Sequence, residues 1–254
     1  MDRVWAEQAV QMELTSGLLP CPFEVGVWPG RAGVRFGWTL EAPGGPEAST
    51  AEICFRLADL VDRIPICLCQ VHGDMIVDAD RVQPVDISSP PVGDGLMSAG
   101  RRLLMGVSIA DCAPVFLASR GGVAVLHAGW RGVAGRILPG ALELIERLWG
   151  VSPSDVELIL GPCIGPCCFE VSAAVAALFP EHVRRRHRTG WHVDLPGTLL
   201  DQWLSSGGAA QRFMRLDRCT VCGTPLMYSH RRAPNRGRNF AFMYRLESDQ
   251  ASPA

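Results

Sequence analysis

The stretch that most constrains this chain covers residues 109–132 and reads IADCAPVFLASRGGVAVLHAGWRG. Two apolar runs flank the polar segment SRGG, a pattern that predicts a β-hairpin closed by a two-residue turn. In that register Pro114 lies opposite His127, and Cys112 lies opposite Gly129. Cys112 and His127 then share one face of the hairpin as diagonal neighbours, with backbones roughly 7–8 Å apart. We expect their side chains to converge on one small species, either a proton or a metal ion.

A thiol and an imidazole on one face are typical of two kinds of site. One is a Cys–His nucleophilic pair, in which Cys112 and His127 would be the catalytic residues. The other is a metal centre, for which His72 in the motif QVHG offers a third ligand. Two histidines and one cysteine form a catalytic zinc set that leaves one position open. From spacing alone, a packed cysteine and a hydrogen-bonded histidine remain an alternative.

Two arginine-containing motifs are candidates for binding an anion. In HAGWRG, Arg131 lies between two glycines and just before a predicted helix, where free amides and a guanidinium favour a bound anion. The segment SHRRAPNRGR adds Arg231 and Arg232 in a turn-rich stretch. Ordinary solvated turns are the alternative for both motifs. A metal-activated water beside an anion pocket would suit hydrolysis or phosphorolysis.

The remaining cysteines do not match a known metal-ligand spacing. CTVC (Cys219 to Cys222) is a CxxC pair, but a structural zinc site requires a second such pair. CIGPCC (Cys163 to Cys168) is poorly spaced for that role, so we interpret these cysteines as packing or incidental residues. The chain has 10 cysteines and no export signal, which predicts reduced thiols.

Composition excludes several classes of protein. The net charge of −2 argues against a nucleic-acid partner. No apolar run reaches the ~20 residues of a membrane span, so we expect a cytoplasmic protein. All 24 cationic residues are Arg, which rules out Schiff-base catalysis and a Walker-type lysine. The 254 residues are expected to form a single domain over 1–254.

The periodicity predicts a mixed α and β domain. Ser49 or Thr50 is expected to cap a helix that continues to Ile64. We also expect an amphipathic helix over 133–150 with a possible kink at Pro139. The other predicted elements are helices at 172–179 and 194–205 and strands within 23–40, 66–73, 103–112, 115–118, 123–128, 157–160, 213–217 and 239–246. The run HVRRRHRTGWH is expected to be a solvated loop.

Several motifs together resemble the laccase-domain, or YfiH-like, family, whose members are described as polyphenol oxidases and as purine nucleoside phosphorylases. The motifs are QVHG, GDGLMSAGRRLLMGVSIADCAPVFL, HAGWRG, GPCIGPCCFEV, CT and SHRR…GR, in the family's order over residues 70–246. The resemblance implies an α+β fold, a single domain of packed mixed β-sheets flanked by helices. That fold is similar to bacterial toxin deamidases that use a Cys–His pair.

The resemblance also implies a site and an activity. The metal ligands would be His72, Cys112 and His127, with zinc as the usual ion and copper also possible. The implied reaction is phosphorolysis of adenosine, inosine and methylthioadenosine, with adenosine deamination at the same site. The partners would be a purine nucleoside and phosphate. Arg131, Arg231 and Arg232 are the candidate phosphate-binding residues.

Three other functions stay open at this point. One is a copper-dependent oxidase of phenols, although six histidines and no HxH pair argue against a multicopper centre. The second is a metal-free hydrolase or deamidase that uses Cys112 and His127. The third is a folded partner module without catalytic activity.

Residues 1–69 depart from the family's pattern. Glu41 lies near the position of an expected arginine, and the usual Asn-Leu-Gly segment is missing. Because that region helps to build the family's substrate pocket, phosphate or nucleoside binding can differ here. We expect residues 247–254 to be a disordered tail.

Overall fold

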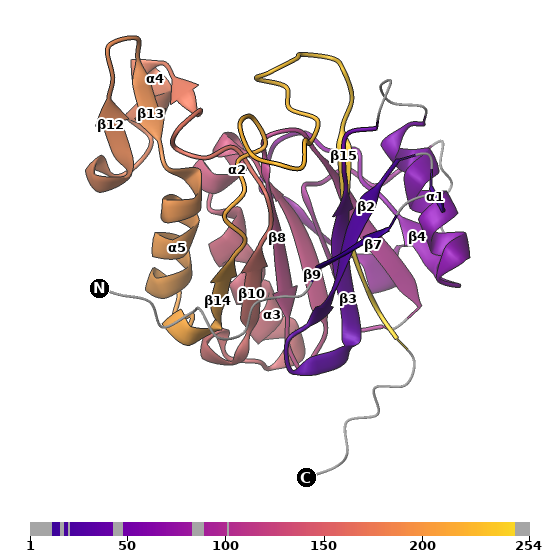
Figure 1. The fold of residues 1–254 in the computed structure, drawn as a ribbon. Helices are drawn as coiled ribbons and strands as arrows, with labels where there is room; N and C mark the ends of the chain where they lie inside the picture. Colours follow the sequence, from indigo (N-terminus) through magenta and orange to yellow (C-terminus); the bar gives the residue numbers. More distant parts are fainter. Residues whose placement is uncertain are drawn as a thin grey trace.

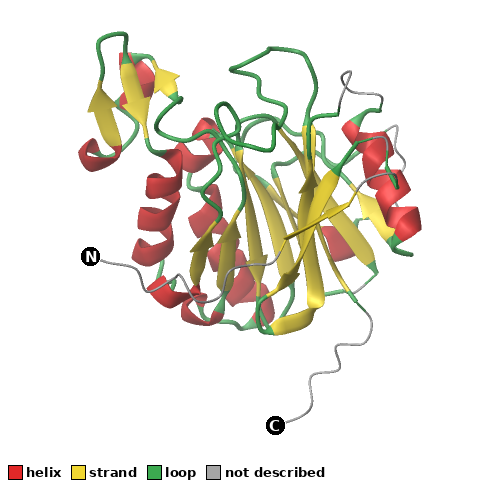
Figure 2. Ribbon diagram, viewed as in Figure 1, coloured by secondary structure: helices red, strands yellow, loops and turns green. Residues whose placement is uncertain are grey.

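The computed structural model describes residues 12–15, 18–19, 21–42, 48–82, 89–100 and 102–246. Within these residues, two six-stranded sheets lie face to face, and helices cover their outer faces (Figures 1 and 2). This arrangement confirms the predicted fold of mixed sheets flanked by helices. The predicted tail 247–254 and the segment around the missing Asn-Leu-Gly (43–47) lie outside the described residues.

The first sheet has the order β1-β2-β3-β15-β7-β4 and is antiparallel except for the β4–β7 pair. Its strands are β1 (Met12–Thr15), β2 (Phe23–Trp28), β3 (Arg31–Thr39), β4 (Ile64–Ile66), β7 (Leu103–Ile109) and β15 (Asn239–Arg245). The C-terminal strand β15 lies in the centre, between β3 and β7. The first three strands and the last strand of the described residues therefore belong to one sheet.

The second sheet has the order β14-β10-β8-β9-β6-β5 and carries the predicted hairpin. Its strands are β5 (Ile76–Asp78), β6 (Gly95–Ser98), β8 (Ala113–Ala118), β9 (Val123–Ala128), β10 (Glu157–Leu160) and β14 (Phe213–Arg215). A third, small sheet consists of β11 (Glu170–Val171), β12 (Arg184–Arg186) and β13 (Trp191–Val193). In Figure 1 the small sheet projects from one end of the molecule.

The hydrophobic core lies in three layers that follow from the apolar faces of the elements. Aromatic side chains such as Phe36, Trp38 and Phe116 fill the space between the two large sheets. Helix α1 (Thr50–Leu60) covers the first sheet. The second sheet is covered by α2 (Trp130–Ala134), α3 (Ile137–Trp149) and α5 (Leu195–Ser205), and α4 (Ala173–Ala176) packs against β13.

The register of the predicted hairpin is confirmed. Pro114 pairs with His127 and Ala118 pairs with Val123, without a bulge between them. The turn closes through the amide of Ser119, which donates to the carbonyl oxygen of Gly122 at 2.9 Å. Cys112 therefore precedes β8 directly, beside the end of β9.

Other local predictions need correction. Ser49 does cap α1 by accepting from the Glu52 amide, but the helix ends at Leu60, and Ile64 begins β4 instead. The predicted kink at Pro139 is replaced by a break between α2 and α3, where Arg136 takes a left-handed conformation at φ 66°. Pro139 lies in the first turn of α3, where the missing N–H has no partner to lose.

Two more expectations differ from the structure. The run HVRRRHRTGWH contains strands β12 and β13 of the small sheet rather than a loop alone. β12 (RRR) is polar, and β13 (WHV) has only three residues, too few for its apolar alternation to mark a strand in a sequence. Only the first residue of the run ICLCQVHG, Ile66, lies in a strand, at the end of β4, and His72 lies in a turn.

No helix among the described residues is long and apolar enough to cross a lipid bilayer.

Candidate metal centre

Three predicted ligands converge at one end of the second sheet. A side-chain nitrogen of His72, the Sγ atom of Cys112 and a ring nitrogen of His127 all lie within 4.8 Å of one another. His127 is buried on β9, Cys112 is partly buried ahead of β8, and His72 is exposed at the rim. The two imidazole rings stand nearly perpendicular, at 81°, with centroids 4.9 Å apart.

A turn held by Asp94 presents His72 to this cluster. The backbone of His72 has φ 60°, a left-handed conformation that non-glycine residues seldom adopt. Three consecutive amides, those of Val71, His72 and Gly73, donate to the Asp94 carboxylate at 3.2, 2.9 and 2.7 Å. These hydrogen bonds hold the strained turn, because breaking it would deprive the buried carboxylate of three donors.

Asp94 also orients His127. Its Oδ1 atom lies 2.8 Å from Nδ1 of His127, and the Asp94 side chain is fully buried. An imidazole whose Nδ1–H donates to a carboxylate presents Nε2 as the ligand atom, which is the usual arrangement around a catalytic zinc ion. Sequence reasoning missed Asp94, because the motif GDG lies at the start of β6, a strand that was not predicted.

The electrostatics of the cluster favour an ionised thiol. Burial by itself raises the pKa of Cys112, but hydrogen bonds with His127 and His72 outweigh it and bring the pKa to about 7. Burial by itself lowers the pKa of His127, but Asp94 and Cys112 outweigh it and raise the pKa to about 9. Cys112 is thus a ready thiolate ligand or nucleophile.

Two glycines of HAGWRG are required by close packing around the ligands. A Cβ atom on Gly129 would lie 2.9 Å from the Cys112 Sγ atom and 3.6 Å from Cδ2 of His72. A Cβ atom on Gly132 would lie 2.6 Å from the carbonyl oxygen of Gly73. Larger residues at either position would push the ligands apart.

Two of the three predicted phosphate-binding arginines lie at the surface. Arg131 is exposed on α2, and its guanidinium stacks 4.2 Å from the centroid of the Trp130 ring. Arg231 is exposed and donates through Nη2 to the carbonyl oxygen of Glu170 at 2.8 Å. Its amide donates to Asp111, the residue directly before Cys112, at 2.7 Å. Arg231 also lines a cavity of about 490 Å³ beside the small sheet.

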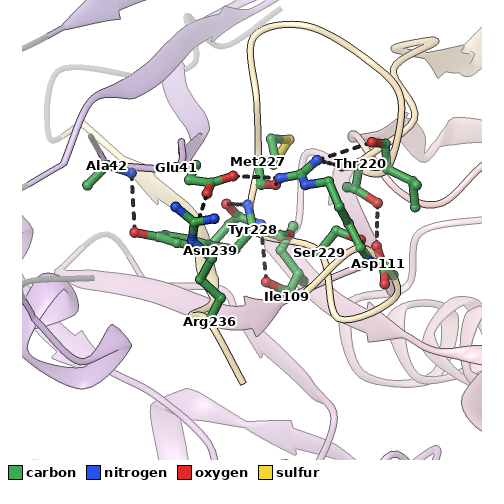
Figure 3. Close-up of polar contacts among 12 residues, drawn as sticks. Glu41, Ala42, Ile109, Asp111, Thr220, Met227, Tyr228, Ser229, Arg236 and Asn239 are labelled. Carbon is green, nitrogen blue, oxygen red and sulfur yellow. Dashed lines mark hydrogen bonds and ion pairs between the residues drawn. The ribbon is translucent and has the colours of Figure 1, made fainter. Parts of the chain in front are cut away.

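Arg232 is held by more partners than Arg231, whose Nη1 and Nη2 each donate to one carbonyl oxygen, those of Cys168 and Glu170. In Arg232, Nη1 donates to the carbonyl oxygens of Thr220 and Val221, and Nη2 donates to Met227 and to the Glu41 carboxylate at 2.5 Å. The Glu41 carboxylate also pairs with Arg236, whose Nε lies 3.4 Å from it (Figure 3). A phosphate-binding role for Arg232 stays a prediction.

The Glu41 contacts give the divergent N-terminal segment a structural role. The residue near the expected arginine position carries the opposite charge and binds two arginines of the segment SHRRAPNRGR. The same region is held by Tyr228, whose hydroxyl accepts from the amide of Ala42 at 3.2 Å (Figure 3). Asn239 then fixes Tyr228 by accepting from its amide and donating to its carbonyl oxygen.

A second group of potential ligands corrects the interpretation of the other cysteines. The Sγ atoms of Cys167, Cys168, Cys219 and Cys222 all lie within 4.8 Å of one another. These residues come from the two motifs CIGPCC and CTVC, which the sequence analysis treated as packing or incidental cysteines. The structure brings both motifs together, and this group is called the cysteine cluster below.

Comparisons with known proteins show what the chain is similar to. A sequence model described as "Multi-copper polyphenol oxidoreductase laccase" matches residues 49–246. The chain is 33% identical over 199 residues to "Purine nucleoside phosphorylase YlmD" of Geobacillus stearothermophilus, covering 72% of each chain. It is 33% identical over 192 residues to "Adenosine deaminase RL5" of an unknown prokaryotic organism, covering 69% of this chain and 73% of that protein.

The fold is shared with a solved structure of the same relative. The crystal structure of YlmD from Geobacillus stearothermophilus superposes with a TM-score of 0.79 at 30% identity. The match covers 92% of this chain and 99% of that one, so it includes most of the segment before residue 70 that diverges in sequence.

Proposed function

The chain belongs to the laccase-domain family, and from that premise we propose that it is a metal-dependent purine nucleoside phosphorylase. Its substrates would be adenosine, inosine and methylthioadenosine, with adenosine deamination as a side activity. The observation that carries the proposal is the convergence of His72, Cys112 and His127 above the buried carboxylate of Asp94. The names of the relatives, purine nucleoside phosphorylase and adenosine deaminase, support the choice of reaction.

The ligand set fits a zinc ion. Two imidazoles and one thiolate give three protein ligands, as in zinc sites that leave the fourth position for water or substrate. The exposed position of His72 provides access from solvent, and Asp94 supplies the carboxylate that such sites place behind a histidine. A bound zinc ion would supply a Lewis acid next to the substrate. Copper accepts the same ligand types and is the competing ion.

The arginines beside the centre of His72, Cys112 and His127 would bind the second substrate, phosphate. In phosphorolysis a phosphate oxygen forms a bond to C1′ of the ribose as the bond from C1′ to the base nitrogen breaks. The base leaves with that electron pair and takes up a proton. The guanidinium groups of Arg131 and Arg231 would hold the dianion in place, because charge-assisted hydrogen bonds to phosphate are strong and directional. The hydrogen bond from the Arg231 amide to Asp111 ties this arginine to the residue before Cys112.

The test is an assay of product formation with zinc-loaded protein of measured metal content. Adenosine and inosine are incubated with and without phosphate, and the products are separated by chromatography. We expect adenine and hypoxanthine to appear only with phosphate, and to be lost in Cys112→Ala. Cys69→Ala is the matched control, because this exposed thiol lies outside the ligand cluster.

Other results would point to the remaining functions. Inosine formed from adenosine, with no release of adenine or hypoxanthine when phosphate is added, would leave only the deaminase. Oxidation of phenols by copper-loaded protein would favour the oxidase. Activity that survives chelation but is lost on thiol alkylation would favour a metal-free Cys112–His127 hydrolase. No turnover of any nucleoside by zinc-loaded protein would contradict the proposal.

A further inference from the structure

The cysteine cluster has the dimensions of a tetrahedral metal site. Zinc–thiolate bonds of about 2.3 Å separate the four sulfurs of a tetrahedron by about 3.8 Å. The Sγ atoms of Cys167 and Cys222 are 3.7 Å apart, and the other sulfur pairs lie within 4.8 Å. Four thiols that converge in this way require little movement to close around one ion.

Two neighbouring parallel strands build the site. β10 and β14 pair in parallel, with Leu160 opposite Arg215, so the loops that follow them leave the same edge of the sheet. The pairing continues as a bridge between Cys163 and Cys219. The Cys163 amide donates to the Arg218 carbonyl oxygen at 3.2 Å, and the Thr220 amide donates to the Cys163 carbonyl oxygen at 3.1 Å. The backbone therefore positions both loops without the help of an ion.

The backbone around Cys219 is shaped to hold a thiolate. The amide of Gly165 donates to the Cys219 Sγ atom at 3.3 Å, and a Cβ atom on Gly165 would lie 3.3 Å from the Cys167 sulfur. Amide donors to a cysteine sulfur stabilise its ionised form, which is the form that binds metals.

We propose that Cys167, Cys168, Cys219 and Cys222 bind a structural Zn²⁺ ion, separate from the centre at His72, Cys112 and His127. Four thiolates in a closed tetrahedron are the ligand set of structural zinc, whereas a catalytic site keeps an open position. Four soft thiolate ligands in a tetrahedral arrangement are typical of either a zinc ion or an iron–sulfur centre. One compact set of four sulfurs fits a single zinc ion.

The proposed ion would fasten the two loops that support the candidate active site. Asp111 accepts from the Ile164 amide at 2.9 Å through its carbonyl oxygen and from the Thr220 hydroxyl at 2.7 Å through its carboxylate. Arg231 donates through Nη1 to the carbonyl oxygen of Cys168 at 3.3 Å. Both loops thus contact residues directly beside Cys112. The inference does not depend on the reaction proposed above.

The test is metal analysis of the 254-residue chain and four single variants, each reconstituted with Zn²⁺ under reducing, oxygen-free conditions. We expect two zinc ions per wild-type chain, one in Cys112→Ala and one in Cys222→Ala. Cys222→His retains a metal-binding side chain and should bind two, which separates lost ligation from misfolding. Cys69→Ala, an exposed thiol outside both ligand groups, should also bind two.

Cobalt gives a second readout. Co²⁺ in the Cys112→Ala protein should give strong thiolate-to-metal charge-transfer absorption and tetrahedral d–d bands, and Cys222→Ala in that background should lose them. Equal zinc content in wild type and Cys222→Ala would overturn the proposal. Retention of iron or copper in place of zinc would also overturn it. So would disulfide bonds among these cysteines, which native mass spectrometry would detect as a loss of two hydrogens for each bond.

Discussion

The two groups of ligands differ in how the fold holds them. His127 lies on the central strand β9 and pairs with the buried carboxylate of Asp94. The same carboxylate accepts three amide hydrogen bonds that fix the turn carrying His72. The cysteine cluster lies on two loops beyond β10 and β14, at the edge of that sheet, and Cys167 and Cys222 are exposed. The first group has a mixed, three-ligand set, and the second has four sulfurs. A rigid metal site with an open coordination position suits catalysis, whereas a closed four-ligand site that joins two loops suits stabilisation of the fold.

The comparison predicts that only one of the two groups is needed for turnover, which is the largest expected effect. Cys112→Ala should lose phosphate-dependent turnover to background, and because it also loses one bound zinc ion, its midpoint of thermal unfolding should fall as well. Cys222→Ala should retain turnover at 25 °C but unfold at a lower temperature. At a free zinc concentration of about 100 Kd, the lost binding is worth about 2.7 kcal/mol, or roughly 5–10 °C in Tm.

Activity assays and differential scanning calorimetry in the same buffer measure both quantities. If both variants lose turnover and stability together, the two groups are one functional unit and the comparison fails.

Asp94→Asn should produce the next largest effect and sharpen the account of the first group. The amide cannot accept all of the hydrogen bonds that the carboxylate receives from the turn and from His127, so the ligands lose their orientation. Loss of such a carboxylate costs about 10–100-fold in metal affinity or activity. Zinc titration against a competing chelator measures the affinity, with the exposed Asp59→Asn as control. Unchanged affinity would show that Asp94 does not position the ligands.

A pair of glycine substitutions tests the close packing around the ligands. Gly129→Ala places a methyl group 2.9 Å from the Cys112 sulfur and should cost about 1–3 kcal/mol of unfolding free energy. Gly140→Ala, on α3, meets nothing within 4 Å and should gain about 0.5–1 kcal/mol. Urea denaturation measures both, and equal effects would refute the steric explanation.

The arginines test where the phosphate binds, with the smallest expected change. Arg231→Gln should raise KM for phosphate about 10-fold, because a charge-assisted hydrogen bond contributes about 1.5–3 kcal/mol. Arg232→Gln should lower Tm instead, since its guanidinium is bonded to Glu41 and to three carbonyl oxygens. Phosphate-dependent kinetics and thermal unfolding separate the two effects. A larger KM change in Arg232→Gln would reverse the assignment.

The same contrast explains what could be predicted from the sequence. The Cys112–His127 relation follows from one hairpin, because a two-residue turn fixes which residues face each other. The cysteine cluster depends on pairing between β10 and β14, and Cys167 and Cys222 are 55 residues apart in sequence. Local spacing carries no information about such a pairing, and the adjacent Cys167 and Cys168 do not follow the usual ligand spacing.

Backbone conformation accounts for two further differences. The sequence indicated that His72 ends a strand, whereas it lies in a left-handed turn that the buried Asp94 stabilises. A carboxylate that binds main-chain amides leaves no side-chain pattern for a sequence to reveal. The strands β12 and β13 were also missed, since each has only three residues and β12 has no apolar side chain that could reveal it in the sequence.

Anomalous diffraction from crystals of the zinc-loaded protein, collected on both sides of the zinc absorption edge, would test the central claim most directly. The account predicts one zinc peak among His72, Cys112 and His127 and a second among the four sulfurs of the cysteine cluster. Absence of a peak at His72, Cys112 and His127 in fully loaded, active crystals would contradict the claim that these residues form a catalytic metal centre.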